Sequence, residues 1–273
     1  MSDLMQIYTN TQAMHTRAAM MKVNNKLSNH QYRLSTGKKI NSASEDPAGY
    51  ALARTLEKRK RGLAVALQNS KNANSIMNIA EGGYQNIMDI IQIVKEKATQ
   101  AADYSLNTAQ RTALNDQVQA LILEVDEIVG DTTFNNQDLI NGTYAGDFQT
   151  GERSDDILSV SLSNSDSNAL GMASIDLTTQ ASARTGIQQS SDAIDALASA
   201  IQDVGEYKVR LNSKLNALAT QETNTEAVRS TIEDADFAAE QMEVVKQQIL
   251  QQTSVMALTQ ANSAPQIVLS LLQ

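Results

Sequence analysis

Apolar residues recur at alternating spacings of three and four near both ends of this chain, and this period constrains the fold more than any other feature. The stripe near the N-terminus consists of Met20, Val23, Leu27 and Leu34, with His30 between them. The stripe near the C-terminus consists of Ala238, Met242, Val245, Ile249 and Met256. Only two of the 273 residues are prolines, so long helices meet few breaks. Both ends are therefore predicted to be long amphipathic helices.

The helical period continues inward from both ends. Asp46-Pro47 is predicted to start one tract, because Asp is a good N-cap and proline is favoured at the first helical position. This tract is expected to end near Tyr104, and another covers residues 114–128 and stops at Gly130-Asp131. The stripe resumes over residues 194–218, and Thr223-Asn224-Thr225 is predicted to end it. Breaks this short between long helices favour antiparallel neighbours.

Residues 134–181 lose the helical period. This region contains turn signals at Asn135-Asn136, Asn141-Gly142 and Gly146-Asp147. Residues 157–162 alternate between two faces, which is typical of a strand. A small β-hairpin region is therefore predicted, and it becomes the far tip of the fold if the two ends pair with each other.

The predicted fold is mainly α, with long antiparallel coiled-coil helices from both chain ends and a small β-hairpin region in the middle. We expect residues 1–42 and 232–273 to form the two halves of one helical domain. Residues 43–133 and 182–231 supply the helices of a middle coiled-coil domain, and residues 134–181 form the hairpin region.

The apolar stripes of the two ends have little else in the chain to pack against. An isolated helix of this kind is marginal in water and forms with partners. We therefore expect contacts with other copies of the chain to stabilise both ends. The candidate assembly residues come from the two stripes and the closing run, and they are Met20, Val23, Leu27, Leu34, Met242, Val245, Ile249, Met256, Val268, Leu269, Leu271 and Leu272.

Composition and motifs argue against several other functions. The net charge of −9 disfavours nucleic acid as a partner, and no apolar run reaches the roughly 18 residues of a membrane-spanning helix. The chain has no cysteine, and His15 and His30 fall in no metal-binding motif. Asp155-Asp156 lies in a turn without partners for acid–base chemistry. We expect no cofactor, no metal, no membrane insertion and no enzymatic activity.

A group of methionines and a basic run are each interpreted as structural features without a binding function. Met14, Met20 and Met21 are interpreted as core packing. The basic run Lys58-Arg-Lys-Arg61 is interpreted as a solvated or intersubunit helix face that acids such as Glu233 of a neighbour would meet.

Two stretches at opposite ends resemble the signatures of bacterial flagellins. The first, Leu34–Gly49, reads LSTGKKINSASEDPAG and resembles the N-terminal signature. The stretches Ile232–Phe237, Gln248–Gln252 and Leu258–Leu272 resemble the C-terminal signature. The resemblance covers roughly residues 7–140 and 155–273, and it indicates a short form that lacks the large outer domains.

This resemblance implies a structural subunit that polymerises with other copies of itself into the bacterial flagellar filament, for motility. It implies that the two terminal parts line the filament core and that the hairpin region lies at the outer surface. It also implies an extracellular location reached without a cleaved signal peptide. Further implied partners are an export chaperone on the C-terminal segment, the export apparatus, and the hook-junction and cap proteins.

An innate immune receptor that binds many flagellins is a further partner implied by the resemblance. Its contact surface lies on the second and third helical tracts. Where recognised flagellins carry an arginine and a leucine, this chain has Ile93 and Lys97, and Gln117 stands at an acidic position. The resemblance therefore implies weak binding to this receptor.

Two alternatives belong to other functional classes. One is the hook–filament junction protein, a flagellin relative that Asp46-Pro47 also resembles. The other is a secreted coiled-coil adhesin with the hairpin as its contact site. Long filaments of the purified protein would favour the polymer subunit, and discrete oligomers would favour the adhesin.

Overall fold

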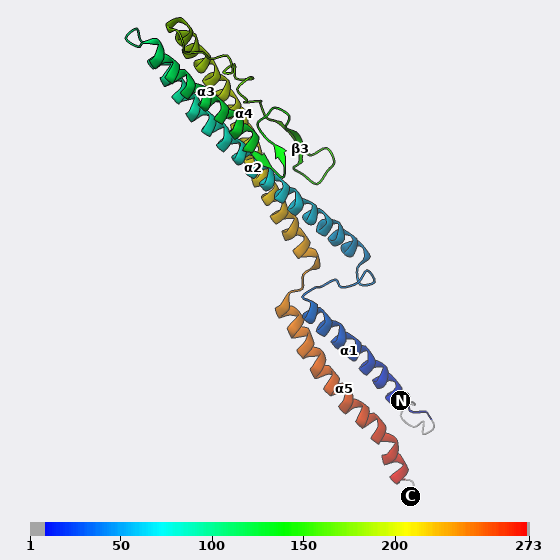
Figure 1. Ribbon diagram of the computed structural model, residues 1–273. Helices are drawn as coiled ribbons and strands as arrows, with labels where there is room; N and C mark the ends of the chain where they lie inside the picture. The colour runs from blue at the N-terminus through cyan, green and yellow to red at the C-terminus, as the bar shows by residue number, and fades with distance from the viewer. Residues whose placement is uncertain (1–8, 272–273) are drawn as a thin grey trace. The chain divides into compact units, whose positions relative to one another are not determined.

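The computed structural model describes the backbone of residues 9–271 and the side chains of residues 9–263. In chain order the helices and strands are α1 (Thr11–Thr36), α2 (Pro47–Ala101), α3 (Thr108–Asp131), β1 (Thr133–Phe134), β2 (Gln137–Asp138), β3 (Ala145–Gln149), β4 (Ile157–Ser161), α4 (Gln180–Glu233) and α5 (Phe237–Leu271) (Figure 1). This is the mainly helical fold with a small β region that the sequence predicts. No helix within the described residues is long and apolar enough to span a membrane.

The described residues divide into two compact units. The terminal unit combines the residues up to Lys58 with those from Asn224 onward, and the middle unit consists of Arg59–Thr223. Both α2 and α4 contribute residues to each unit. The boundary between the two units therefore lies within two long helices. The boundaries predicted from the sequence, at residues 42/43 and 231/232, lie where the hydrophobic period changes.

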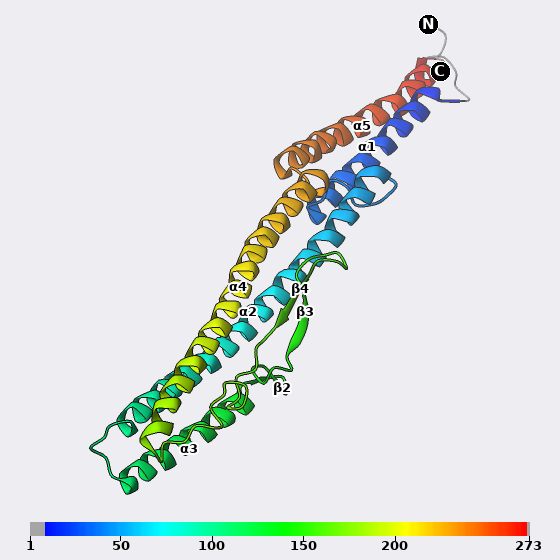
Figure 2. The same cartoon turned by 90° about the horizontal axis from the view of Figure 1, so that it is seen from above.

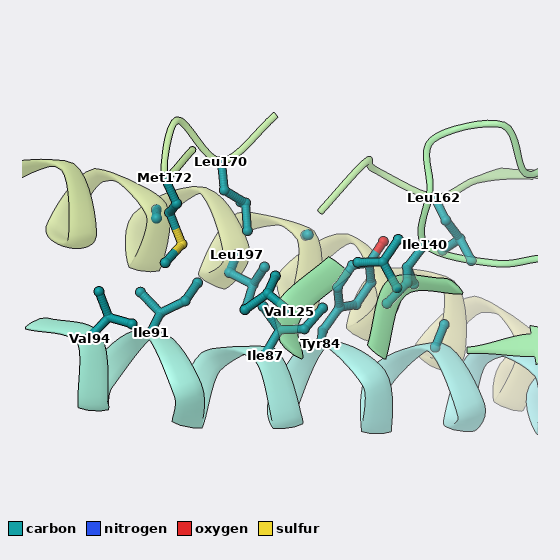
Figure 3. Close-up of a cluster of buried hydrophobic side chains, with 14 of the residues drawn as sticks. Tyr84, Ile87, Ile91, Val94, Val125, Ile140, Leu162, Leu170, Met172 and Leu197 are labelled. Atoms are coloured by element: carbon teal, nitrogen blue, oxygen red, sulfur yellow. The ribbon is translucent and has the colours of Figure 1, made fainter. Parts of the chain in front are cut away.

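The middle unit is built around one apolar core between α2, α3 and α4 (Figure 3). From Ala73 onward, the fully buried residues of α2 alternate at spacings of four and three, and they are Ala73, Met77, Ala80, Tyr84, Ile87, Ile91, Val94, Ala98 and Ala101. Val125 of α3 and Leu197 of α4 lie in the same cluster. This spacing is the seam of a coiled coil, in which small and branched side chains allow helices to approach closely.

The β3–β4 hairpin closes one side of this core. The two strands pair antiparallel, with Phe148 opposite Leu158. Leu158 and Val160 are buried while their neighbours in β4 are exposed, which confirms the predicted period of two. The hydroxyl of Tyr84 donates to the carbonyl oxygen of Ser163 at 2.8 Å, and burial raises the pKa of Tyr84 to about 12.

The hairpin does not form the far tip that we expected. Figures 1 and 2 show that the α2–α3 loop forms one end of the middle unit, whereas the hairpin lies along the helices. The Arg59 guanidinium of α2 pairs with the Glu152 carboxylate at 3.0 Å, and Asn69 donates to the carbonyl oxygen of Gln149 at 3.4 Å. The expectation failed because the apolar face of β4 must pack on the helices to leave water.

Two of three helix ends that we predicted from local sequence signals are confirmed by the structure. As predicted, α2 starts at Pro47, and the Asp46 carboxylate accepts the backbone N–H of Gly49 at 3.0 Å. The third helical tract ends at Asp131, as predicted. The predicted end of α4 at residues 223–225 is wrong, because the hydroxyl of Thr223 donates to the carbonyl oxygen of Ala219 and the helix continues to Glu233.

Candidate functional site

In the terminal unit, α1 packs along α5, so the two ends of the chain pair within one subunit (Figure 1). On α1, Leu27 is buried and Met20, Val23 and Leu34 are half-buried. On α5, the covered series recurs at spacings of four and three and consists of Glu240, Val244, Gln247, Gln251, Ser254, Leu258 and Ala261. We call these two sets the seam.

Several polar contacts cross the seam. The imidazole Nδ1 of His30 lies 2.6 Å from a carboxylate oxygen of Glu240, and Arg33 lies 3.6 Å from the other oxygen. Gln251 donates to the side-chain oxygen of Asn24 at 2.8 Å. Leu27, Val244 and Ala261 are the buried apolar residues of the seam, so hydrophobic burial adds to these polar contacts at three positions.

The apolar stripe of α5 faces away from α1. Met242 and Ile249 each follow a seam residue by two positions, which is about 200° around a helix of 3.6 residues per turn. The exposed fractions are 67% for Met242, 45% for Val245, 58% for Ile249 and 65% for Met256. We call Ala238 and these four residues the outer face of α5. It is a row of large apolar side chains that nothing in the described chain covers.

The predicted assembly residues therefore fall into three groups. Met20, Val23, Leu27 and Leu34 lie in the seam, whereas Met242, Val245, Ile249 and Met256 lie on the outer face. These two stripes do not pack on each other, because another side of α5, where Val244, Gln247 and Ala261 are buried, meets α1. The backbone of Val268, Leu269 and Leu271 continues α5 but their side chains, like all of Leu272, lie outside the described residues.

Sequence reasoning also missed an exposed face on α1. Met14 is 64% exposed and Met21 is 54% exposed, and Tyr32 lies on the same side of the helix. The interpretation of Met14 and Met21 as core residues is therefore wrong. Their spacing of seven contained the signal, since it places both on one side of the helix, away from the stripe that includes Leu27.

The two stretches that resemble flagellin signatures meet in the terminal unit. The backbone N–H of Lys39 donates to the carbonyl oxygen of Glu233 at 2.7 Å, and the N–H of Ala235 donates to that of Gly37 at 2.9 Å. Gly37 has a φ of 69°, a left-handed conformation that ends α1 and that glycine adopts without strain. These contacts join the loop after α1 to the break between α4 and α5.

Glu233 is the centre of this junction, and it is only 1% exposed. Its carboxylate lies 2.6 Å from Lys38, 2.5 Å from Arg229 and 3.2 Å from Arg54. Burial opposes ionisation of Glu233, but the hydrogen bonds and charges of Lys38 and Arg229 outweigh it and hold its pKa below the ordinary value. Glu233 is therefore paired within its own chain, with Lys38, Arg54 and Arg229.

The remaining sequence candidates are the acidic pair of the hairpin and the possible metal ligands. Asp155 and Asp156 lie in the turn between β3 and β4, where Asp156 accepts the backbone N–H of Arg153 at 3.2 Å. In the part of the chain that the structure describes, no three His, Asp or Glu side chains gather as a metal site would require. The outer face of α5 and the Glu233 junction are thus the features that a function must explain.

Family comparisons cover most of the chain. The model of the bacterial flagellin N-terminal helical region matches residues 7–145, and the model of the C-terminal helical region matches residues 187–272. A structure assigned to a flagellar hook-associated protein of Vibrio parahaemolyticus covers 70% of this chain, with a TM-score of 0.59 and 12% identity. At that identity the likeness shows the fold alone.

Curated relatives match over nearly their whole length. The flagellin of Halalkalibacterium halodurans is 32% identical, over 88% of this chain and 90% of the relative. The flagellin of Bacillus subtilis is 30% identical, over 98% and 100%. A flagellar filament core protein of Treponema phagedenis is 28% identical, over 97% and 98%. These matches favour neither the junction protein nor the adhesin, and they show that the chain belongs to the bacterial flagellins, the structural subunits of the flagellar filament.

Proposed function

We propose that the outer face of α5 is a surface through which one subunit binds its neighbours in the filament. The observation that carries this proposal is the exposure of Met242, Val245, Ile249 and Met256 in a single chain. A row of large exposed apolar side chains marks an interaction site. Contact between this face and a different surface of the next copy is heterologous, and such contacts build open helical polymers when they do not close. Seeded filament growth by variants with a charge on this face tests the proposal, and growth at the wild-type rate would contradict it.

The other predicted assembly residues have different roles in this proposal. Met20, Val23, Leu27 and Leu34 act indirectly, because they hold α1 against α5 and so keep the outer face on a rigid helix pair. Val268, Leu269, Leu271 and Leu272 extend the apolar character of the C-terminal end. The terminal unit thereby forms the filament core and the middle unit the outer layer, with the hairpin region at the outer surface.

The finer parts of the functional assignment rest on the family resemblance. They are a purely structural role without catalysis and export without a cleaved signal peptide. They also include binding of the C-terminal segment by an export chaperone, and contacts with the export apparatus and with the hook-junction and cap proteins. A chaperone of this kind would cover the outer face of α5 before assembly, because exposed apolar rows promote aggregation.

A short peptide inserted between Ser154 and Asp155 should leave filament growth intact. Both residues are exposed at the turn of the hairpin, and exposed turns tolerate insertion. The same insertion between Gly151 and Glu152 is the matched control, and it should disturb the hairpin more because Glu152 pairs with Arg59 of α2. Electron microscopy of both variants checks this, and loss of filaments from the Ser154–Asp155 insertion would contradict the placement of the hairpin.

The innate immune receptor should respond weakly to this flagellin. Ile93 is exposed and Lys97 half-buried on α2, and Gln117 is exposed on α3. A guanidinium binds carboxylates in a bidentate geometry that Ile93 does not offer, and Lys97 puts a charge where an apolar contact is expected. In a receptor reporter assay the triple variant Ile93→Arg, Lys97→Leu and Gln117→Glu should be at least roughly tenfold more potent than the wild type. Equal potency of the two proteins would refute the assignment of these positions.

A further inference from the structure

Methionine is unusually exposed on the two helices of the terminal unit. The chain has 10 methionines, and among those that the structure describes Met77 and Met172 are completely buried in the middle unit. By contrast, Met242 and Met256 on the outer face of α5 are 67% and 65% exposed. An exposed thioether is open to oxidants, whereas a buried one is shielded by its packing.

We propose that Met242 and Met256 are modification sites at which peroxides inactivate the unassembled subunit. In this reaction the thioether sulfur attacks one oxygen of hydrogen peroxide and the O–O bond breaks. An S–O bond forms, the proton of the transferred hydroxyl passes to the departing hydroxide to give water, and the sulfur loses the two electrons that the peroxide gains. The product is methionine sulfoxide, a polar side chain in place of an apolar one.

The position of these two residues determines the consequence. Both lie on the face that the proposed assembly contact buries, so this inference rests on the proposed function. Burying a sulfoxide without a hydrogen-bond partner costs free energy that burying a thioether does not. Oxidation therefore weakens addition of a subunit to the filament end. In an assembled filament the neighbouring subunit covers the same sulfurs, so the polymer resists the oxidant that disables the monomer.

The test compares oxidation and assembly in the full-length protein. Monomer and filaments are treated with hydrogen peroxide, oxidation is mapped by peptide mass spectrometry, and the treated monomer is added to filament seeds. The matched variant carries Met242→Leu and Met256→Leu, which keep the apolar face but remove both sulfurs. We expect treated wild-type monomer to extend seeds at least roughly tenfold more slowly than untreated monomer. The treated double variant should extend them almost as fast as its untreated form. Met77 and Met172 should stay unoxidised in both proteins.

Three outcomes would overturn the inference. One is oxidation of Met77 or Met172 before Met242 and Met256. Another is full assembly of monomer oxidised at both outer-face sulfurs. A third is equal loss in the treated double variant, which would assign the damage to other residues, such as Met14 and Met21. Assembly of an Ile249→Asp variant separates this inference from the proposed function, because that substitution tests the outer face without any oxidation.

Discussion

Replacing Ile249 by aspartate should abolish filament growth and leave the monomer folded. Ile249 is 58% exposed in the single chain, so the charge stays in water until the subunit meets a neighbour. On assembly the variant loses the roughly 1.5–3 kcal/mol of one buried aliphatic side chain and must also bury a carboxylate. Together these effects exceed about 4 kcal/mol, which is about a thousandfold in subunit affinity.

Two control variants isolate the position and the charge. Ile249→Leu keeps an apolar side chain of equal size and should form filaments at the wild-type rate. Ser213→Asp adds the same charge at an exposed position of α4, and it should also assemble. Circular dichroism of each monomer and electron microscopy after seeding are the measurements. If Ile249→Asp unfolded the monomer, Ile249 would belong to the core of the subunit instead of its assembly face.

Replacing Glu233 by alanine should open the junction that joins the loop after α1 to the break between α4 and α5. The variant leaves Lys38, Arg54 and Arg229 grouped around a buried space without the carboxylate that pairs them. Removing one partner of a buried ion pair typically costs about 3–5 kcal/mol. Hydrogen exchange at the backbone amides of Lys39 and Ala235 reports this directly, because both donate hydrogen bonds across the junction. Their protection should fall by about two to three orders of magnitude.

Glu243→Ala is the matched control for this prediction. Glu243 pairs with Lys246 three residues further along the surface of α5, and such exposed pairs contribute little to stability. Its removal should leave the exchange of Lys39 and Ala235 nearly unchanged. Equal effects of the two substitutions would show that the Glu233 cluster is no more than a surface ion pair.

The same cluster predicts how the junction responds to acid. The pKa of folded Glu233 lies below its ordinary value of 4.5, so its stabilising contribution is complete above that value. The contribution is lost as the pH falls through the lower, folded pKa. The difference in amide protection between wild type and Glu233→Ala should therefore be constant near neutral pH and shrink below about pH 4.5.

The sequence predicted those parts of the fold that depend on local chemistry. Pro47 after Asp46 starts α2 because capping is a property of adjacent residues. The hairpin was predictable because Leu158 and Val160 alternate with serines along one strand. Neither prediction requires knowledge of which segments meet in space.

The partner of each apolar stripe was not predictable from its period. A stripe shows which side of a helix avoids water, but not what covers that side. On α5 the side that meets α1 mixes polar residues with Val244 and Ala261, and pairs such as His30 with Glu240 stabilise it. The cluster around Glu233 was missed for the same reason, because Lys38 and Arg54 reach it only after the chain folds back. Hydropathy carries no signal for contacts made by hydrogen bonds and charges.

The accessibility of residue 249 in monomer and filament tests the central claim most directly. The chain has no cysteine, so an Ile249→Cys variant carries a single thiol and labels without background. A small maleimide should modify this thiol rapidly in the monomer, where the position is 58% exposed, and roughly a hundredfold more slowly in assembled filaments. Equal labelling rates in the two states would contradict the claim that the outer face of α5 is buried between subunits.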